Sequence, residues 1–186
     1  GIASAAHVTA VGANTGGDYN VIIGNYAHAA SNGYGYNVAV GHNALNANET
    51  SDNLAIGYNA GLNITTGNNN VAIGNNALDA LTTANYNTAV GRKALSGANT
   101  ANGTAVGYEA LFTSNAVDAV ALGYKAGRGL TTGANNIFIG VEAGNYSNVI
   151  TDGTRNVIVG NYATASSPGG YDQIVLGYNV TGSAHN

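Results

Sequence analysis

The sequence contains no cysteine, methionine or tryptophan, one proline and few charged residues. Without cysteine it can form neither disulfide bonds nor thiolate metal sites, so the redox compartment is not indicated. Five basic residues among 186 and a net charge of -4 give no electrostatic footprint for nucleic acid. The apolar runs are far too short to cross a bilayer. No signal peptide is visible, and a start at Gly1 without Met is expected of a processed product or a fragment.

The composition instead favours small and turn-forming residues. Glycine contributes 28 residues and asparagine 29, while 45% of the chain is hydrophobic. That content argues against disorder, yet most of it is Ala, Val and Ile, so a large aromatic core cannot be assembled. We therefore expect a thin core that is built by stacking.

One phrase recurs along the whole chain, and Asn70-Val-Ala-Ile-Gly-Asn-Asn-Ala-Leu78 is its clearest copy. Counted from its glycine, the phrase has Asn at minus four, a β-branched residue at minus three, Ala at minus two, an aliphatic residue at minus one and Ala at plus three. Repetition at 16 to 17 residues is typical of a solenoid. The sequence thus predicts one all-β domain, a parallel β-solenoid of about eleven coils, whose glycines are Gly12, Gly24, Gly41, Gly57, Gly74, Gly91, Gly107, Gly123, Gly140, Gly160 and Gly177.

The repeats divide this single domain, residues 1–186, into three parts. Residues 1–13 form a degenerate copy that we expect to cap the array, and residues 14–134 form regular coils. From 135 to 186 the minus-two alanine is replaced by Phe138, Ile158 and Val175, and 20 residues separate Gly140 from Gly160. We expect these last coils to be wider or differently packed.

Within a coil, the residues before the glycine alternate as in a strand but are apolar on both faces, which is typical of a strand buried on both sides. We expect the minus-three and minus-one residues to fill the coil. The alanine column would then need a cover, either a second strand of the same coil, formed by Thr-rich segments such as Leu62–Gly67, or a sister chain. The second segment is short and polar, so the sister chain is favoured. The minus-four asparagines should stack as an amide ladder that is interrupted at Gly103, Ala119 and Gln173.

These repeats resemble the heads of trimeric autotransporter adhesins, where Asn-Ser-Val-Ala-Ile-Gly builds a left-handed parallel β-roll. They are more similar still to the repeats of some bacteriophage tail fibres, through Asn87-Thr-Ala-Val-Gly-Arg-Lys-Ala-Leu95, Gly103-Thr-Ala-Val-Gly-Tyr-Glu-Ala-Leu111 and Thr65-Thr-Gly-Asn-Asn-Asn70. The resemblance implies a left-handed β-roll, a homotrimer and attachment to a surface. It also implies a location in a virion, as part of a tail fibre, or on the bacterial cell surface.

Two columns carry candidate chemistry. Tyrosines at plus one can stack on sugar rings with little loss of conformational entropy, or can simply cover neighbouring coils; they are Tyr58, Tyr108, Tyr124 and Tyr178. At plus two, consecutive coils carry Lys93, Glu109, Lys125 and Glu142. We interpret these as a ladder of alternating charge, because stacked like charges would repel. A catalytic pair of Glu109 and Glu142 is the less favoured alternative, since the lysine between them keeps both ionised.

The leading hypothesis is a structural and attachment segment of a trimeric fibre that binds a host cell-surface glycan or protein. The chain is expected to be no enzyme, to bind no cofactor or metal, and to have neither nucleic acid nor membrane as a partner. The alternative is a monomeric ice-binding solenoid with a row of Thr66, Thr83 and Thr100, although Thr113 and Thr132 break its spacing. A third hypothesis is a polysaccharide depolymerase spike.

Overall fold

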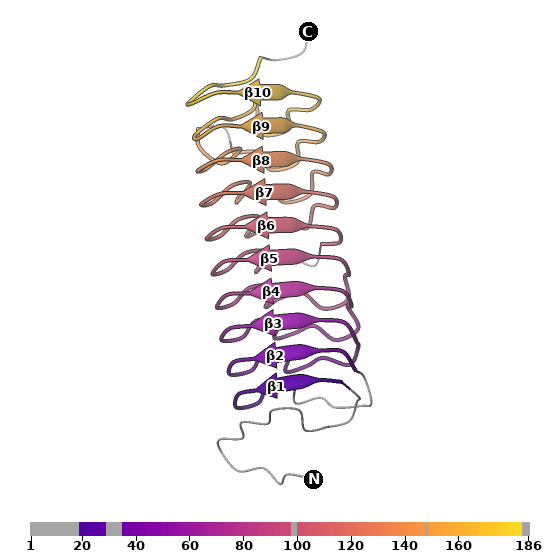
Figure 1. The fold of residues 1–186 in the computed structure, drawn as a ribbon. Coiled ribbons are helices and arrows are strands. Elements are labelled where there is room, and N and C mark those ends of the chain that lie inside the picture. Colours follow the sequence, from indigo (N-terminus) through magenta and orange to yellow (C-terminus); the bar gives the residue numbers. More distant parts are fainter. Residues whose placement is uncertain (1–18, 29–34, 98–99, 148, 184–186) are drawn as a thin grey trace.

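The computed structural model describes residues 19–28, 35–97, 100–147 and 149–183, and these residues form one rod (Figure 1). Every strand has three residues, and the strands pair in parallel, in chain order, into one ten-stranded sheet. The fold is therefore an all-β parallel solenoid, as the repeats predicted, and the described residues form about nine turns of the eleven coils expected. The first copy, around Gly12, and the expected cap at 1–13 lie outside the described residues. The strands are β1 (Val21–Ile23), β2 (Val38–Val40), β3 (Leu54–Ile56), β4 (Val71–Ile73), β5 (Thr88–Val90), β6 (Thr104–Val106), β7 (Val120–Leu122), β8 (Ile137–Ile139), β9 (Val157–Val159) and β10 (Ile174–Leu176).

The expected second strand of each coil is absent from the described parts of the chain. The Thr-rich segments form turns and bends instead. The backbone N–H groups of Thr65, Thr66 and Gly67 all donate to the carbonyl of Thr82, at 2.8, 3.2 and 3.3 Å. In a parallel sheet each N–H group donates to its own carbonyl at an even spacing, so three donors on one acceptor indicate a turn and not a strand. Each coil thus has one strand and a wall of linked turns.

The two faces of the sheet are the reverse of those expected. The minus-two alanines point into the coil, where Ala39, Ala55 and Ala72 are completely buried. They lie in a core with leucines and isoleucines of the same chain, such as Leu45, Ile64 and Leu81, so this column needs no sister chain. The minus-three and minus-one residues face outward, as the alternation of half-exposed and buried residues in each strand shows. Small alanines suit the inside, because a coil with one three-residue strand leaves little room.

The core changes its packing at β8, where Phe138 replaces the alanine and is fully buried. Four other coils place a buried leucine at plus four, namely Leu45, Leu78, Leu95 and Leu111, but the two coils around Phe138 have Gly127 and Gly144 there. A Cβ atom on either glycine would lie only 2.6 or 2.3 Å from the phenyl ring. The ring therefore occupies the space that leucines occupy in those four coils.

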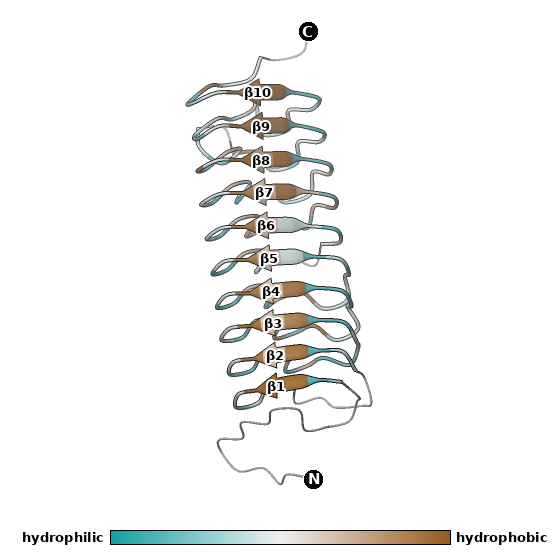
Figure 2. Cartoon of the chain, in the orientation of Figure 1, coloured by the Kyte–Doolittle hydropathy of each residue, from teal (hydrophilic) through white to brown (hydrophobic). Residues whose placement is uncertain are grey.

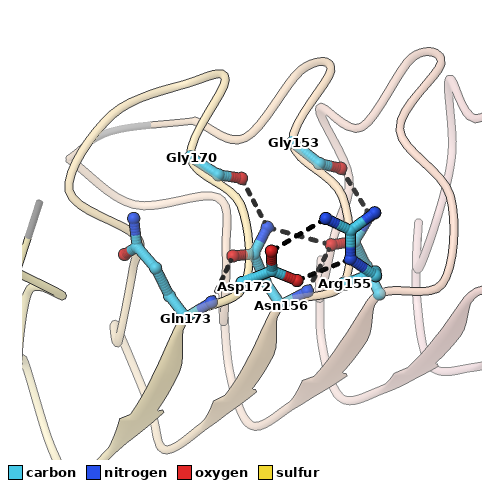
Figure 3. Close-up of polar contacts among 7 residues, drawn as sticks. Gly153, Arg155, Asn156, Gly170, Asp172 and Gln173 are labelled. Carbon is cyan, nitrogen blue, oxygen red and sulfur yellow. Dashed lines mark hydrogen bonds and ion pairs between the residues drawn. The ribbon is translucent and has the colours of Figure 1, made fainter. Parts of the chain in front are cut away.

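The asparagine ladder is present and buried. Its side-chain oxygens accept the backbone N–H of the next coil, and its amide groups donate to carbonyls of the wall opposite; for Asn70 these partners are the N–H of Asn87, at 3.0 Å, and the carbonyl of Ala84, at 3.1 Å. Figure 3 shows the same pattern at Asn156, which donates to Gly170 and accepts from the N–H of Gln173. Gln173 thus remains joined to the ladder through its backbone and ends it, since its own side chain turns to Ser166.

Candidate functional site

The turns that follow the strands carry the plus-one tyrosines. Backbone hydrogen bonds stack these turns from coil to coil, as from the N–H of Lys125 to the carbonyl of Tyr108, at 2.8 Å. Tyr108 and Tyr124 are neighbours, with ring centroids 5.4 Å apart and planes inclined by 14°. Tyr58 instead contacts His42, and Tyr178 contacts Tyr162. The four predicted tyrosines share one column, but among them only Tyr108 and Tyr124 stack on each other.

Four cations lie on the turns of the three coils from β5 to β7, and each lies over an aromatic ring. The guanidinium of Arg92 is 5.5 Å from the ring centroid of Tyr108, and the ammonium of Lys125 is 4.9 Å from that of Tyr124. Arg128 and Lys93 both approach the ring of Phe112, at 5.3 and 5.6 Å. Such contacts are worth about 0.5–1 kcal/mol each at exposed sites, and they restrict long side chains that would otherwise sample many rotamers.

The plus-two residues do stack coil on coil, but Glu109 does not pair with a lysine of that column. Its carboxylate accepts a hydrogen bond from the Nε of Arg128 at 2.7 Å, and the residue is 7% exposed. Burial by itself raises the pKa of Glu109, but hydrogen bonds from Arg128 and Tyr108 and the charges of Arg128 and Lys125 outweigh it and lower the pKa. Because its proton is held weakly, Glu109 is poorly suited to be the general acid of a glycosidase.

The opposite end of each strand carries a second polar column, five residues before the glycine. Its members have a left-handed backbone and exposed side chains, as in Tyr19 and Tyr36, whose rings stack at 5.2 Å. Further along, Arg155 binds Asp172 through two hydrogen bonds of 2.5 and 2.8 Å (Figure 3). This exposed ion pair raises the pKa of Arg155. Sequence reasoning missed this column, although its spacing from the glycines is regular.

The threonines proposed as an ice-binding row differ in their exposure. Thr66 and Thr83 are exposed, but Thr100 is buried at 1% exposure. The threonine row is therefore too short for the flat, regular face that ice binding requires. Among the described residues, no three His, Asp or Glu side chains gather closely enough to hold a metal ion. Over the same residues, no helix is present that could span a membrane.

Reasoning from the sequence also missed Arg92, Phe112 and Arg128 as site residues. The signal was available, since four of the five basic residues lie between positions 92 and 128 in an otherwise acidic chain. Their offsets from Gly91, Gly107 and Gly123 place Arg92 at plus one, and Phe112 and Arg128 at plus five. Those offsets predict that these residues lie on one flank of three successive coils.

Comparison with known proteins gives no relative for this chain: no family model, curated protein or solved structure matches it. The class of protein is therefore defined by the fold itself, a parallel β-solenoid with an aromatic and partly basic column on the turns after its strands.

Proposed function

We propose that the chain is a structural and attachment segment of a homotrimeric fibre, in a phage tail fibre or a bacterial surface adhesin, that binds a glycan or protein on a host cell. The observation that carries the proposal is the outward face of the sheet. Its twenty minus-three and minus-one residues include no charged residue, and only Thr88 and Thr104 are polar. We call these twenty residues the apolar strip.

The apolar strip has the size and continuity of an interface. At about 4.8 Å per strand, its ten strands extend over roughly 45 Å. The strands are coloured as hydrophobic except for the paler β5 and β6, which begin with Thr88 and Thr104, and polar turns lie beside them (Figure 2). Exposed fractions of 39% at Ile56 and Val106 show that the face is open in the single chain. Contiguous apolar surfaces of this kind mark protein–protein contacts. The threefold arrangement is what the resemblance to tail fibres and adhesin heads implies.

A fibre of this kind leaves both flanks of the sheet available for recognition. The tyrosine columns lie on these flanks, on the turns beside the apolar strip, and several of their members are at least half exposed, for example Tyr36 at 62% and Tyr58 at 50%. Tyrosine offers a large amphipathic contact area, which suits sugar rings and polar protein surfaces.

The experiment is the native mass in solution, measured by light scattering after size exclusion. A trimer should have about three times the mass of the 18.5 kDa chain. The double variant Ile56→Lys, Val106→Lys should reduce the mass to that of one chain, because it places charges within the apolar strip. Tyr86→Lys, which places a charge on the flank and not in the apolar strip, should leave the trimer intact. A wild-type monomer would overturn the proposal.

A further inference from the structure

The charges of this protein are unevenly distributed. Arg92 and Lys93 follow β5, and Lys125 and Arg128 follow β7, so four of the five basic residues lie within three successive coils. The turn after β6, between them, contributes Tyr108 and Phe112. We call Arg92, Lys93, Tyr108, Tyr124, Lys125 and Arg128 the basic aromatic patch.

Three of these cations lack a direct ion-pair partner among the described residues, although a hydrogen bond to Tyr124 and the nearby charges of Glu142 and Glu109 raise the pKa of Lys125. Within the described part of the chain, Arg92, Lys93 and Lys125 make no ion pair, whereas Arg128 is paired with Glu109. The three coils between β5 and β8 carry four positive charges and two negative ones, Glu109 and Asp118, or +2, in a chain of net charge -4. Asp118 precedes β7 and therefore lies at the opposite end of the strand from the patch. The neighbouring acids lie at the borders: Asp79 is hydrogen-bonded to Ser96 and Asn76, and Glu142 follows β8.

The same residues are held in place before any ligand arrives. All four cations rest on aromatic rings at 4.9 to 5.6 Å. Arg128 is further fixed by the buried Glu109, and Arg92 approaches the hydroxyl of Tyr108 at 3.4 Å. The rings of Tyr108 and Tyr124 stack on each other, so the pair offers ring edges and the hydroxyl groups between the charges. Preorganisation of this kind reduces the entropy that binding must overcome.

We propose that the basic aromatic patch binds an acidic carbohydrate. A sugar ring would lie against the edges of the Tyr108–Tyr124 pair, while its carboxylate or sulfate group would lie among Arg92, Lys93 and Lys125. Charge-assisted hydrogen bonds to such an anion are roughly twice as strong as neutral ones. A nucleic acid is disfavoured, because the basic surface covers only three coils and has acids at both borders. This inference names the ligand class of the proposed attachment function and therefore rests on it.

The test is direct binding of the full chain to immobilised polysaccharides. The probes are polysialic acid and hyaluronate as carboxylate sugars, heparin as a sulfated sugar, and dextran as a neutral control. We expect retention on at least one acidic polymer, none on dextran, and weaker binding as salt rises. Preference between the carboxylate and sulfate polymers identifies the anion.

Variants then locate the site. Lys93→Gln with Lys125→Gln should weaken binding at least tenfold, and Arg155→Gln, which removes a cation outside the patch, should change it less than twofold. Tyr124→Ala should lose affinity while leaving the salt dependence unchanged, and Tyr124→Phe should retain most of it. The thermal midpoint of each variant, measured by circular dichroism, confirms that the protein remains folded.

Three results would overturn the inference: no acidic polymer binds, dextran binds equally, or Arg155→Gln loses as much affinity as the lysine variant. Binding of nucleic acid or of a protein alone would also overturn it. These failures are separable from failure of the proposed function. If the chain is trimeric and adheres to host cells while the patch variants adhere normally, the attachment function stands and the patch is not its site.

Discussion

At the residue scale, the position after each strand requires glycine, because the backbone of the next coil lies too close for a side chain. Gly91 has φ +133, a conformation that side chains rarely adopt, and a Cβ atom there would lie 2.5 Å from the carbonyl oxygen of Gly107. The same approach recurs at Gly41, whose Cβ would lie 2.4 Å from the oxygen of Gly57. The glycine column therefore lets successive turns stack at strand spacing.

We predict that Gly91→Ala destabilises the fold by about 2–4 kcal/mol, because it combines an unfavourable φ with overlap against backbone that cannot move away. Chemical denaturation measures the loss. Gly169→Ala is the matched control: its backbone φ is ordinary, and its Cβ would meet only the Asp152 carboxylate, at 3.3 Å. Equal stability of the two variants would contradict the role of the column.

A second residue-scale prediction concerns His28, which is 2% exposed and whose Nδ1 has no partner among the described residues. Burial lowers the pKa of His28 from the ordinary value of 6.5. The unfolded chain therefore takes up a proton first as pH falls below 6.5, and the folded state loses stability on acidification.

In His28→Gln the stability should depend less on pH between 7 and 5, whereas His42→Gln should keep the wild-type dependence because His28 is retained. Denaturant titrations at several pH values measure this. A wild-type slope that persists in His28→Gln would show that another group is responsible.

At the element scale, each coil depends on side-chain amides because its strand has only three residues. A three-residue strand makes few ladder hydrogen bonds, so the minus-four asparagine extends the pairing and ties the strand to the opposite wall. Asn87 shows this on both sides: its N–H and its amide donate to Asn70, and its own oxygen accepts the N–H of Gly103 at 2.9 Å. The ladder continues in the backbone where Gly103 offers no side chain.

We predict that Asn70→Ala destabilises the protein by about 2–4 kcal/mol, because it leaves the buried N–H of Asn87 and the carbonyl of Ala84 without these partners. The control is Asn69→Gly, one residue earlier: Asn69 is exposed and has a left-handed backbone that glycine adopts freely, so this loss should be less than about 1 kcal/mol. Thermal or denaturant unfolding compares them. A similar loss in both variants would mean that the ladder adds little stability.

At the scale of the whole molecule, every strand contacts only its neighbours in sequence order. A solenoid of this kind has stability that is approximately a sum of coil and nearest-neighbour terms. Damage to one coil should therefore remain local. Phe138, whose ring lies against both Gly127 and Gly144, offers a place to test this.

Phe138→Ala removes a buried phenylalanine, which typically lowers the free energy of unfolding by about 3–5 kcal/mol. We predict that this variant speeds amide hydrogen exchange in β7 to β9 more than in β2 to β4. Mass spectrometry of exchanged peptides reads both regions in one experiment. Leu45→Ala should reverse the pattern and affect the N-terminal coils. Uniformly faster exchange along the rod in both variants would show that it unfolds as one cooperative unit.

The sequence by itself determined the solenoid, the period, the parallel order of the strands and the amide ladder, because each follows from repetition at a fixed spacing. It also placed Tyr108 and Tyr124 in one column. The tertiary structure decided which strand face is inside, since alternation is symmetric and both faces of Val71-Ala-Ile73 are apolar. It also decided that Glu109 binds Arg128. This contact spans 19 residues and depends on how the side chain of Arg128, at plus five, reaches the turn of the preceding coil.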